Sequence, residues 1–137
     1  MARFKRVWLR PYVDDFLRFV LTHFDVAIWT SNIRENALAL LDTLLSKAEQ
    51  SKLKFIWSRE QCDIGYNYSS TKPLQFVWNC FSYTPENTLI LDDSPEKIIG
   101  FPSCYVQVSE FTPDKISNDI ELLRIIHHLE STLYKQL

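Results

Sequence analysis

The sequence predicts an α/β fold, in which a mostly parallel sheet is covered by helices on both faces. Short apolar runs that fit buried strands alternate with longer segments of helical periodicity. Strands separated by helices are joined by right-handed crossovers, which place successive strands parallel. With 137 residues, 46% of them hydrophobic, the chain has the size of one ordinary domain. We therefore expect a single domain over residues 1–137.

The strands are expected from apolar runs bounded by turn-forming residues. Four of these runs fit strands that are buried on both faces, as in a parallel sheet. The alternating stretch RFKRVWL, residues 3–9, fits an edge strand. The four predicted buried strands cover residues 25–31, 53–58, 88–93 and 103–108.

Helices are expected where apolar residues recur at intervals of three and four. Pro11 lies just before the first of these segments, at a position suited to a helix start. The predicted helices cover residues 12–24, 34–50 and 119–133, and a further one begins at the Lys72-Pro73 pair. Residues 59–71 have the composition of a loop.

Composition excludes several classes of protein. A formal net charge of −2 gives no basic excess, so we do not expect a nucleic-acid partner. No apolar run reaches the ~20 residues that span a bilayer, and we expect an intracellular protein. Gly65 and Gly100 are the two glycines, which rules out a glycine-rich phosphate loop. Three widely spaced cysteines indicate reduced thiols rather than a metal site.

Polar side chains follow the predicted strands at their carboxyl ends. The strand over 25–31 ends in Thr30 and Ser31. The strand over 88–93 ends in Asp92 and Asp93, and the loop before the next long helix presents Lys72. Because ligands of parallel α/β sheets bind outside the carboxyl ends of the strands, we expect these side chains at one edge.

These residue types suit a phosphate group and a metal ion. A hydroxyl can donate a hydrogen bond to a phosphate oxygen, and a lysine can neutralise another. Mg²⁺ prefers carboxylate and water oxygens, so one acid of the Asp92-Asp93 pair can bind it while the other orients Lys72 or a water. The plainer alternative is that Asp92 and Asp93 only form a turn before Pro95.

The order of four motifs resembles a known family. RPYVDDFL, VAIWTSN, STKPLQFVW and TLILDDSP occur in this order between about Val7 and Val108. They resemble the haloacid dehalogenase superfamily phosphatase domain that acts on the carboxy-terminal domain of RNA polymerase II, also called the NLI-interacting-factor domain. The resemblance implies a three-layer, Rossmann-like fold and dephosphorylation of phosphoserine or phosphothreonine with Mg²⁺.

The resemblance also implies a role for each matched residue. Thr30 matches the phosphate-binding hydroxyl, which Ser31 could replace, and Lys72 matches the phosphate-stabilising lysine. Asp93 matches the magnesium ligand and Asp92 the adjacent acid.

One departure concerns the nucleophile. The family attacks phosphorus with the first aspartate of a DxDxT motif on an early strand, and no DxDxT occurs in the printed sequence. Asp14 and Asp15 match a helix of the family instead, where first-turn acids are favoured by the helix dipole. We expect the domain to be N-terminally incomplete, without this first motif strand.

In the family's fold the missing strand lies between the strands that here end in Thr30 and Asp93. A gap there leaves buried backbone groups unpaired, each at a cost on the order of 1–3 kcal/mol. We expect a stable chain only if these two strands pair directly, if RFKRVWL moves in, or if another chain or sequence outside this one supplies a strand. The added strand could come from a second copy of the chain in a homo-oligomer or from a different partner protein.

Three functional hypotheses follow. The first is a pseudophosphatase or interaction module that binds a phosphoprotein or protein partner without turnover. The second is a Mg²⁺-dependent phosphoserine/phosphothreonine phosphatase whose DxDxT strand lies outside this chain. The third is an α/β domain without a phosphate site. The resemblance allows nuclear, cytoplasmic and mitochondrial locations.

Overall fold

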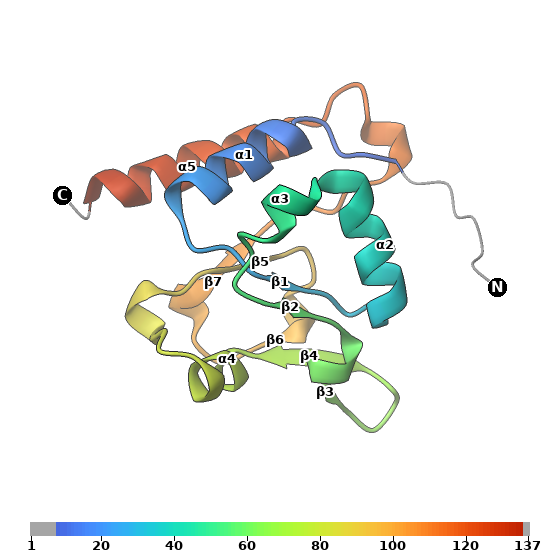
Figure 1. Cartoon of the computed structure of the whole chain (residues 1–137), viewed down its shortest axis with the longest axis vertical. Helices are drawn as coiled ribbons and strands as arrows, with labels where there is room; N and C mark the ends of the chain where they lie inside the picture. Colours follow the sequence, from blue (N-terminus) through green and yellow to red (C-terminus); the bar gives the residue numbers. More distant parts are fainter. Residues whose placement is uncertain (1–7, 136–137) are drawn as a thin grey trace. The chain divides into compact units, whose positions relative to one another are not determined.

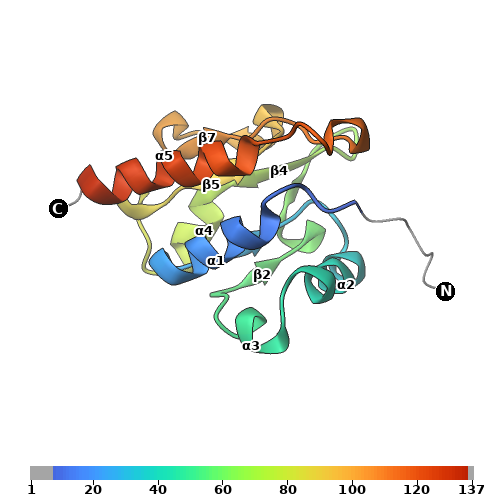
Figure 2. The same cartoon turned by 90° about the horizontal axis from the view of Figure 1, so that it is seen from above.

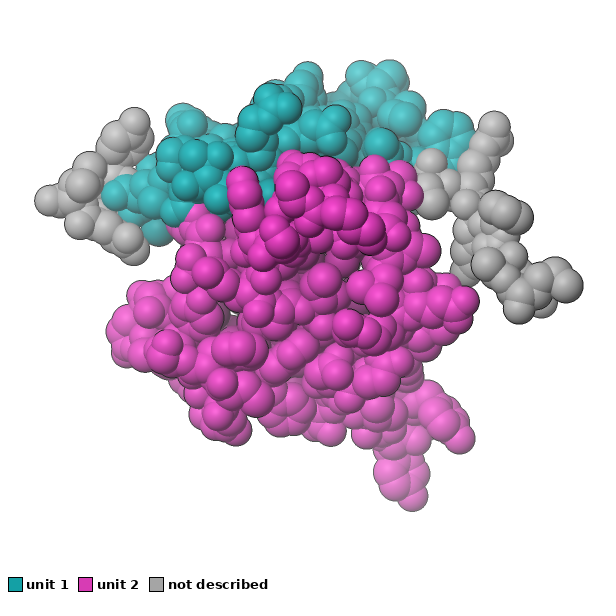
Figure 3. Space-filling view, viewed as in Figure 1, with its two compact units in different colours: residues 1–23, 109–137 teal, residues 24–108 magenta. Residues whose placement is uncertain are grey.

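The computed structural model describes residues 8–135, which fall into two compact units. One unit contains residues 8–23 and 109–135, and the other contains residues 24–108 (Figure 3). Two compact units can belong to one domain or to two, so the single domain expected over residues 1–137 stays a prediction. No helix within residues 8–135 is long and apolar enough to cross a membrane.

The first unit, here called the helical unit, is built on two helices, α1 (Val13–His23) and α5 (Glu121–Lys135). They contact each other and run side by side (Figure 1). On α5 the buried residues Leu122, Ile125 and Leu129 follow helical spacing, and α1 buries Val20. Both helices were expected from their periodicity, and both are present.

The second unit, here called the strand unit, contains every strand found in residues 8–135. Its elements are β1 (Ile28–Trp29), α2 (Arg34–Leu44), α3 (Lys47–Gln50), β2 (Ile56–Trp57), β3 (Asp63–Ile64), β4 (Ser70–Pro73), α4 (Leu74–Cys80), β5 (Ile90–Asp92), β6 (Ile98–Ile99) and β7 (Tyr105–Gln107). Short 3₁₀ turns connect several of them, among them η1 (Arg59–Gln61) and η3 (Pro95–Lys97).

The strands form three small sheets within residues 8–135 rather than one. β1 pairs with β2 and β5 pairs with β7, both parallel. β4 lies between β6, which is parallel to it, and β3, which is antiparallel. The α/β class and the parallel pairing are as predicted, whereas the single sheet is not present. Figure 2 shows α2 and α3 beside β2, on the side away from β5 and β7.

The strands are shorter and more exposed than predicted. β1, β2 and β5 consist of half-buried residues, although their sequences are almost wholly apolar. A strand that pairs on one side only keeps an open edge, so its side chains and backbone are less covered than in the middle of a wide sheet. The expectation of strands buried on both faces was therefore wrong for the described chain.

Three local predictions also need correction. The helix expected over 34–50 is two helices, because Leu45 is extended and Ser46 starts α3 with a capping box: Glu49 N–H donates to Ser46 Oγ, and Ser46 N–H donates to Glu49 Oε1. The loop expected over 59–71 contains η1 and the β3–β4 hairpin. Of the edge strand expected over 3–9, Trp8 and Leu9 are not in a strand, and residues 3–7 lie outside the described residues.

Candidate functional site

The first part of the candidate site is the end of β1, where Thr30 and Ser31 follow Trp29. The Thr30 N–H donates to the main-chain oxygen of Trp57 at 2.9 Å, which continues the pairing of β1 with β2. The Thr30 hydroxyl oxygen accepts the N–H of Asn32 at 3.1 Å. Such a turn uses an acceptor position of the hydroxyl and leaves its O–H available to donate.

The second part is the end of β5, where the two adjacent acids differ in their surroundings. Asp92 is the last residue of β5, and Asp93 lies in the bend that follows the strand. The Asp92 side chain is 9% exposed and its Oδ1 accepts the Ser94 N–H at 2.9 Å. Asp93 is exposed, and its Oδ1 accepts the Ser94 hydroxyl at 3.1 Å.

Lys72 forms a buried ion pair with Asp92. Its Nζ lies 2.6 Å from Asp92 Oδ2, and the Lys72 side chain is 7% exposed. Lys72 lies in β4, opposite Ile98 of β6, and not in the loop where the sequence placed it. Separating the two groups would leave a buried charge without its partner, which is costly. The pair therefore holds both side chains in place. The ion pair places Lys72 against Asp92; the role of Asp92 in orienting Lys72 for a phosphate stays a prediction.

A second lysine, which the sequence analysis missed, lies at the same strand ends. Lys97 is the last residue of η3, the 3₁₀ turn that Pro95 starts just beyond Asp93. Its Nζ donates to Ser31 Oγ at 3.1 Å, across 66 residues of sequence. A signal was present, because proline is favoured at the first position of a helical turn, so Pro95 indicates the turn that contains Lys97. The sequence could not show that this turn reaches β1.

The structure thus joins some of the predicted site residues and not others. Lys72 contacts Asp92, and Ser31 contacts Lys97, which adjoins the β6 residue paired with Lys72. The side chains of Thr30 and Asp93 hydrogen-bond to their near neighbours in the chain. We call Thr30, Ser31, Lys72, Asp92, Asp93 and Lys97 the strand-end cluster. The roles assigned to its members remain predictions.

Three acidic groups act on Tyr105 at the β5 side of the cluster. Burial, followed by the charges of Asp92, Asp93 and Glu96, raises the pKa of Tyr105 above its ordinary value. The Tyr105 hydroxyl donates to the main-chain oxygen of Asp92 at 2.8 Å. Three carboxylates near this strand end favour a cation among them.

The residues fit a magnesium ion through one carboxylate. Within residues 8–135 no group of three or more His, Cys, Asp or Glu is placed to hold a metal. Mg²⁺ is commonly held by one or two protein carboxylates together with water and substrate phosphate oxygens, so it does not need such a group. Asp93 is exposed and suits this role, whereas the ion pair with Lys72 makes Asp92 a poorer ligand.

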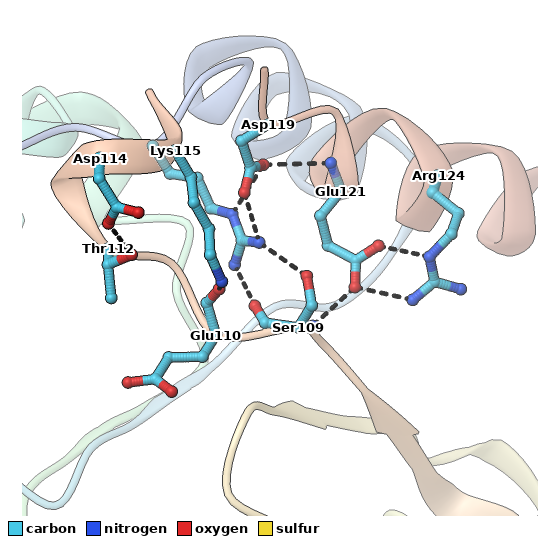
Figure 4. Close-up of polar contacts among 9 residues, drawn as sticks. Ser109, Glu110, Thr112, Asp114, Lys115, Asp119, Glu121 and Arg124 are labelled. Atoms are coloured by element: carbon cyan, nitrogen blue, oxygen red, sulfur yellow. Dashed lines mark hydrogen bonds and ion pairs between the residues drawn. The ribbon is translucent and has the colours of Figure 1, made fainter. Parts of the chain in front are cut away.

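The helical unit contains a separate polar network (Figure 4). Arg10 forms an ion pair with Asp119 at 2.9 Å and donates to the main-chain oxygen of Ser109 at 2.7 Å. Glu121 accepts the Ser109 N–H at 2.6 Å and forms an ion pair with Arg124. These contacts satisfy the charges within the network and connect segments from the two ends of the chain. We interpret the network as structural, because it holds these segments of the helical unit together.

Comparison with known proteins identifies the family. Residues 3–136 match the family described as NLI interacting factor-like phosphatase. The chain belongs to this family. The match covers nearly the whole sequence, as the resemblance of the four motifs predicted.

Two relatives illustrate how this member of the NLI interacting factor-like phosphatase family compares with longer proteins. An FCP1 homology domain-containing protein of Schizosaccharomyces pombe is 27% identical over 138 residues, which cover 88% of this chain and 57% of that protein. CTD small phosphatase-like protein 1 of Caenorhabditis elegans is 31% identical over 121 residues, which cover 88% of this chain and 23% of that protein. The chain thus spans little more than half of the first relative and less of the second.

A solved structure shows the same fold. Fcp1, an essential RNA polymerase II CTD phosphatase, matches with a TM-score of 0.58 at 17% identity, over 94% of this chain and 36% of that chain. The mixed α/β arrangement with small sheets is therefore structurally similar to the fold of Fcp1.

Proposed function

We propose that this domain recognises a phosphorylated serine or threonine of a protein partner at the strand-end cluster. The observation that carries the proposal is the buried Lys72–Asp92 ion pair, which holds an ammonium group at the end of β5. A lysine fixed in this way can donate a hydrogen bond to a phosphate oxygen with little further loss of side-chain entropy on binding. Thr30 donates its hydroxyl to the same phosphate in this proposal.

Magnesium belongs to the same proposal. When bound through Asp93, it supplies positive charge that offsets the carboxylates and polarises the phosphate oxygens. Asp93 holds the ion and Asp92 keeps Lys72 in place.

Turnover requires a further group. Covalent phosphoryl transfer needs a nucleophile in line with phosphorus, and in the family this is an aspartate of the DxDxT motif. The printed sequence contains no such motif, and Asp14 and Asp15 lie in the first turn of α1. We therefore propose that the printed chain by itself binds phosphorylated partners without hydrolysing them, as a pseudophosphatase or interaction module.

The alternative is an active, magnesium-dependent phosphatase whose attacking carboxylate comes from sequence outside the printed residues. The observation that favours it is the coverage of the relatives, because this chain spans 57% of the Schizosaccharomyces pombe protein and 37% of a probable C-terminal domain small phosphatase of Dictyostelium discoideum. In that case the strand-end cluster binds the substrate phosphate during the reaction.

A binding experiment tests the proposal. Isothermal titration with a phosphoserine peptide and its unphosphorylated counterpart, in the presence of Mg²⁺, should show binding of the phosphorylated form alone. Asp93→Asn should remove the dependence of this binding on Mg²⁺, because an amide replaces the carboxylate ligand. Equal binding of the two peptides would overturn the proposal. Magnesium-dependent hydrolysis of para-nitrophenyl phosphate by the printed chain would favour the alternative.

A further inference from the structure

Lys97 differs from Lys72 in how its charge is balanced. The Lys72 ammonium is 2.6 Å from a carboxylate oxygen of Asp92. The Lys97 ammonium contacts the neutral hydroxyl of Ser31 at 3.1 Å, and within residues 8–135 it forms no ion pair. Lys97 is half-buried, so water compensates its charge only in part. It is thus the lysine of the strand-end cluster whose charge is available to an added anion.

Ser31 completes the donor set. In its contact with Lys97 the hydroxyl oxygen acts as acceptor, which leaves the O–H free to donate. An anion placed beside this pair can receive an N–H from Lys97 and the O–H from Ser31. Hydrogen bonds from a charged donor to a charged acceptor are about twice as strong as those between neutral groups.

The position of the pair matches the proposed site. Ser31 follows Thr30 at the end of β1, and Lys97 lies four residues beyond Asp93 in the segment after β5. The hydrogen bond therefore connects the segment with the proposed phosphate-binding hydroxyl to the segment with the proposed magnesium ligand.

We propose that Lys97 and Ser31 form an anion subsite that binds the phosphate of a phosphomonoester. The proposal rests on the proposed function and adds a second positive charge to it. Lys72, held by Asp92, is a fixed and largely neutralised donor, and Lys97 supplies the attraction that selects a dianionic group. Lys72 is already paired with Asp92, and Asp93 and Glu96 add negative charge to the segment that contains Lys97, so phosphate binding is expected to be strongest when Mg²⁺ is also bound.

Inorganic phosphate is the probe that tests the subsite. Its affinity for the full chain is measured in the presence of Mg²⁺ by isothermal titration, and the Ser31 amide is followed by NMR. Lys97→Ala and Lys97→Gln should each weaken phosphate binding by about tenfold or more, since a charged hydrogen bond is worth about 1.5–3 kcal/mol. Lys97→Arg should retain most of the affinity, and Ser31→Ala should weaken it less than loss of the charge does.

Lys52→Ala is the matched control. Lys52 is an exposed lysine of the strand unit, so this variant makes the same change of charge away from the cluster. It should bind phosphate as the unchanged chain does. Circular dichroism of each variant checks that the fold is kept, and Lys97→Gln keeps a hydrogen-bond donor if Lys97→Ala does not fold.

The outcomes separate the two proposals. If the unchanged chain binds phosphate and Lys97→Gln binds it equally well, the subsite is overturned while the proposed function stands. If the unchanged chain binds neither phosphate nor the phosphoserine peptide, both are overturned. A loss confined to the Lys97 variants, with the Ser31 amide shifted by phosphate in the unchanged chain, supports the subsite.

Discussion

At the scale of residues, the adjacent acids Asp92 and Asp93 differ in burial and in their partners, because β5 ends at Asp92 and the chain bends at Asp93. Asp92 is nearly buried and paired with Lys72, whereas Asp93 is exposed and bonded to Ser94. A buried ion pair gives little net stability, since desolvation of both charges offsets their attraction. Its value here is geometric, because it fixes a lysine at the end of β5.

Removing one partner of this pair should destabilise the chain. Lys72→Met leaves the Asp92 carboxylate buried without its counter-charge, and we expect a loss of about 3–5 kcal/mol in the free energy of unfolding. The double variant Lys72→Met/Asp92→Asn should recover part of this loss, because the charge is removed as well. Denaturant unfolding of the single and double variants measures both values. A single variant as stable as the unchanged chain would show that the pair is not buried in solution.

At the scale of elements, several boundaries are decided by local capping. The S-x-x-E sequence of Ser46 to Glu49 forms a capping box that divides one predicted helix into α2 and α3. This pattern can be recognised from the sequence alone. Just before α5, Asp119 Oδ1 accepts the N–H of Glu121, the first residue of the helix, at 3.1 Å, and acids near a helix start are favoured by the helix dipole. The sequence does not reveal contacts between distant segments, such as the hydrogen bond from the Ser109 N–H to Glu121.

Glu121 should make the helical unit sensitive to acid. Hydrogen bonds from Arg124, and then from Ser109, lower the pKa of Glu121 from 4.5 to about 2. Because the folded-state pKa is depressed, ionised Glu121 stabilises the fold above pH 4.5, and this contribution is lost as the pH falls toward 2. Glu121→Gln should therefore lower the melting temperature at neutral pH and flatten its fall in this range.

Thermal unfolding measured across pH values checks this expectation. Glu86→Gln, a change of an exposed acid in the strand unit, is the control and should leave the acid dependence as it is. A Glu121→Gln curve parallel to that of the unchanged chain would contradict the role given to Glu121.

At the scale of the whole molecule, the described strands do not close into one sheet. β1 pairs with β2 and β5 pairs with β7, but β1 and β5 do not pair within residues 8–135. Direct pairing of β1 with β5, one of the expected ways to close the sheet, is therefore absent within residues 8–135. Completion by a further strand, from a partner or from sequence outside these residues, remains a proposal. The indole N–H of Trp29 is buried and has no hydrogen-bond partner in the described chain.

Amide hydrogen exchange should reveal the open edge of β1. The Ile28 and Thr30 N–H groups donate to the main-chain oxygens of Phe55 and Trp57, at 3.1 and 2.9 Å. Because backbone groups alternate along a parallel strand, the Trp29 N–H points away from β2. We expect the Trp29 amide to exchange faster than its two neighbours. Equal protection of all three amides, measured by NMR, would mean that another strand covers this edge.

The sequence by itself determined the α/β class, both main helices of the helical unit, the parallel pairing and the family. These properties follow from short-range periodicity and from ordered motifs, which are present in the chain before it folds. It also placed hydroxyls and acids at the ends of β1 and β5, because polar residues that end apolar runs are visible in the sequence.

The tertiary structure alone decided which of these groups meet. Lys72 pairs with Asp92 across 20 residues, and Lys97 reaches Ser31 across 66, so neither contact could be derived from local spacing. The division into three small sheets was likewise decided by which strands find a partner. Pairing between distant segments depends on the whole arrangement of the chain, and a strand's own sequence does not specify its neighbour.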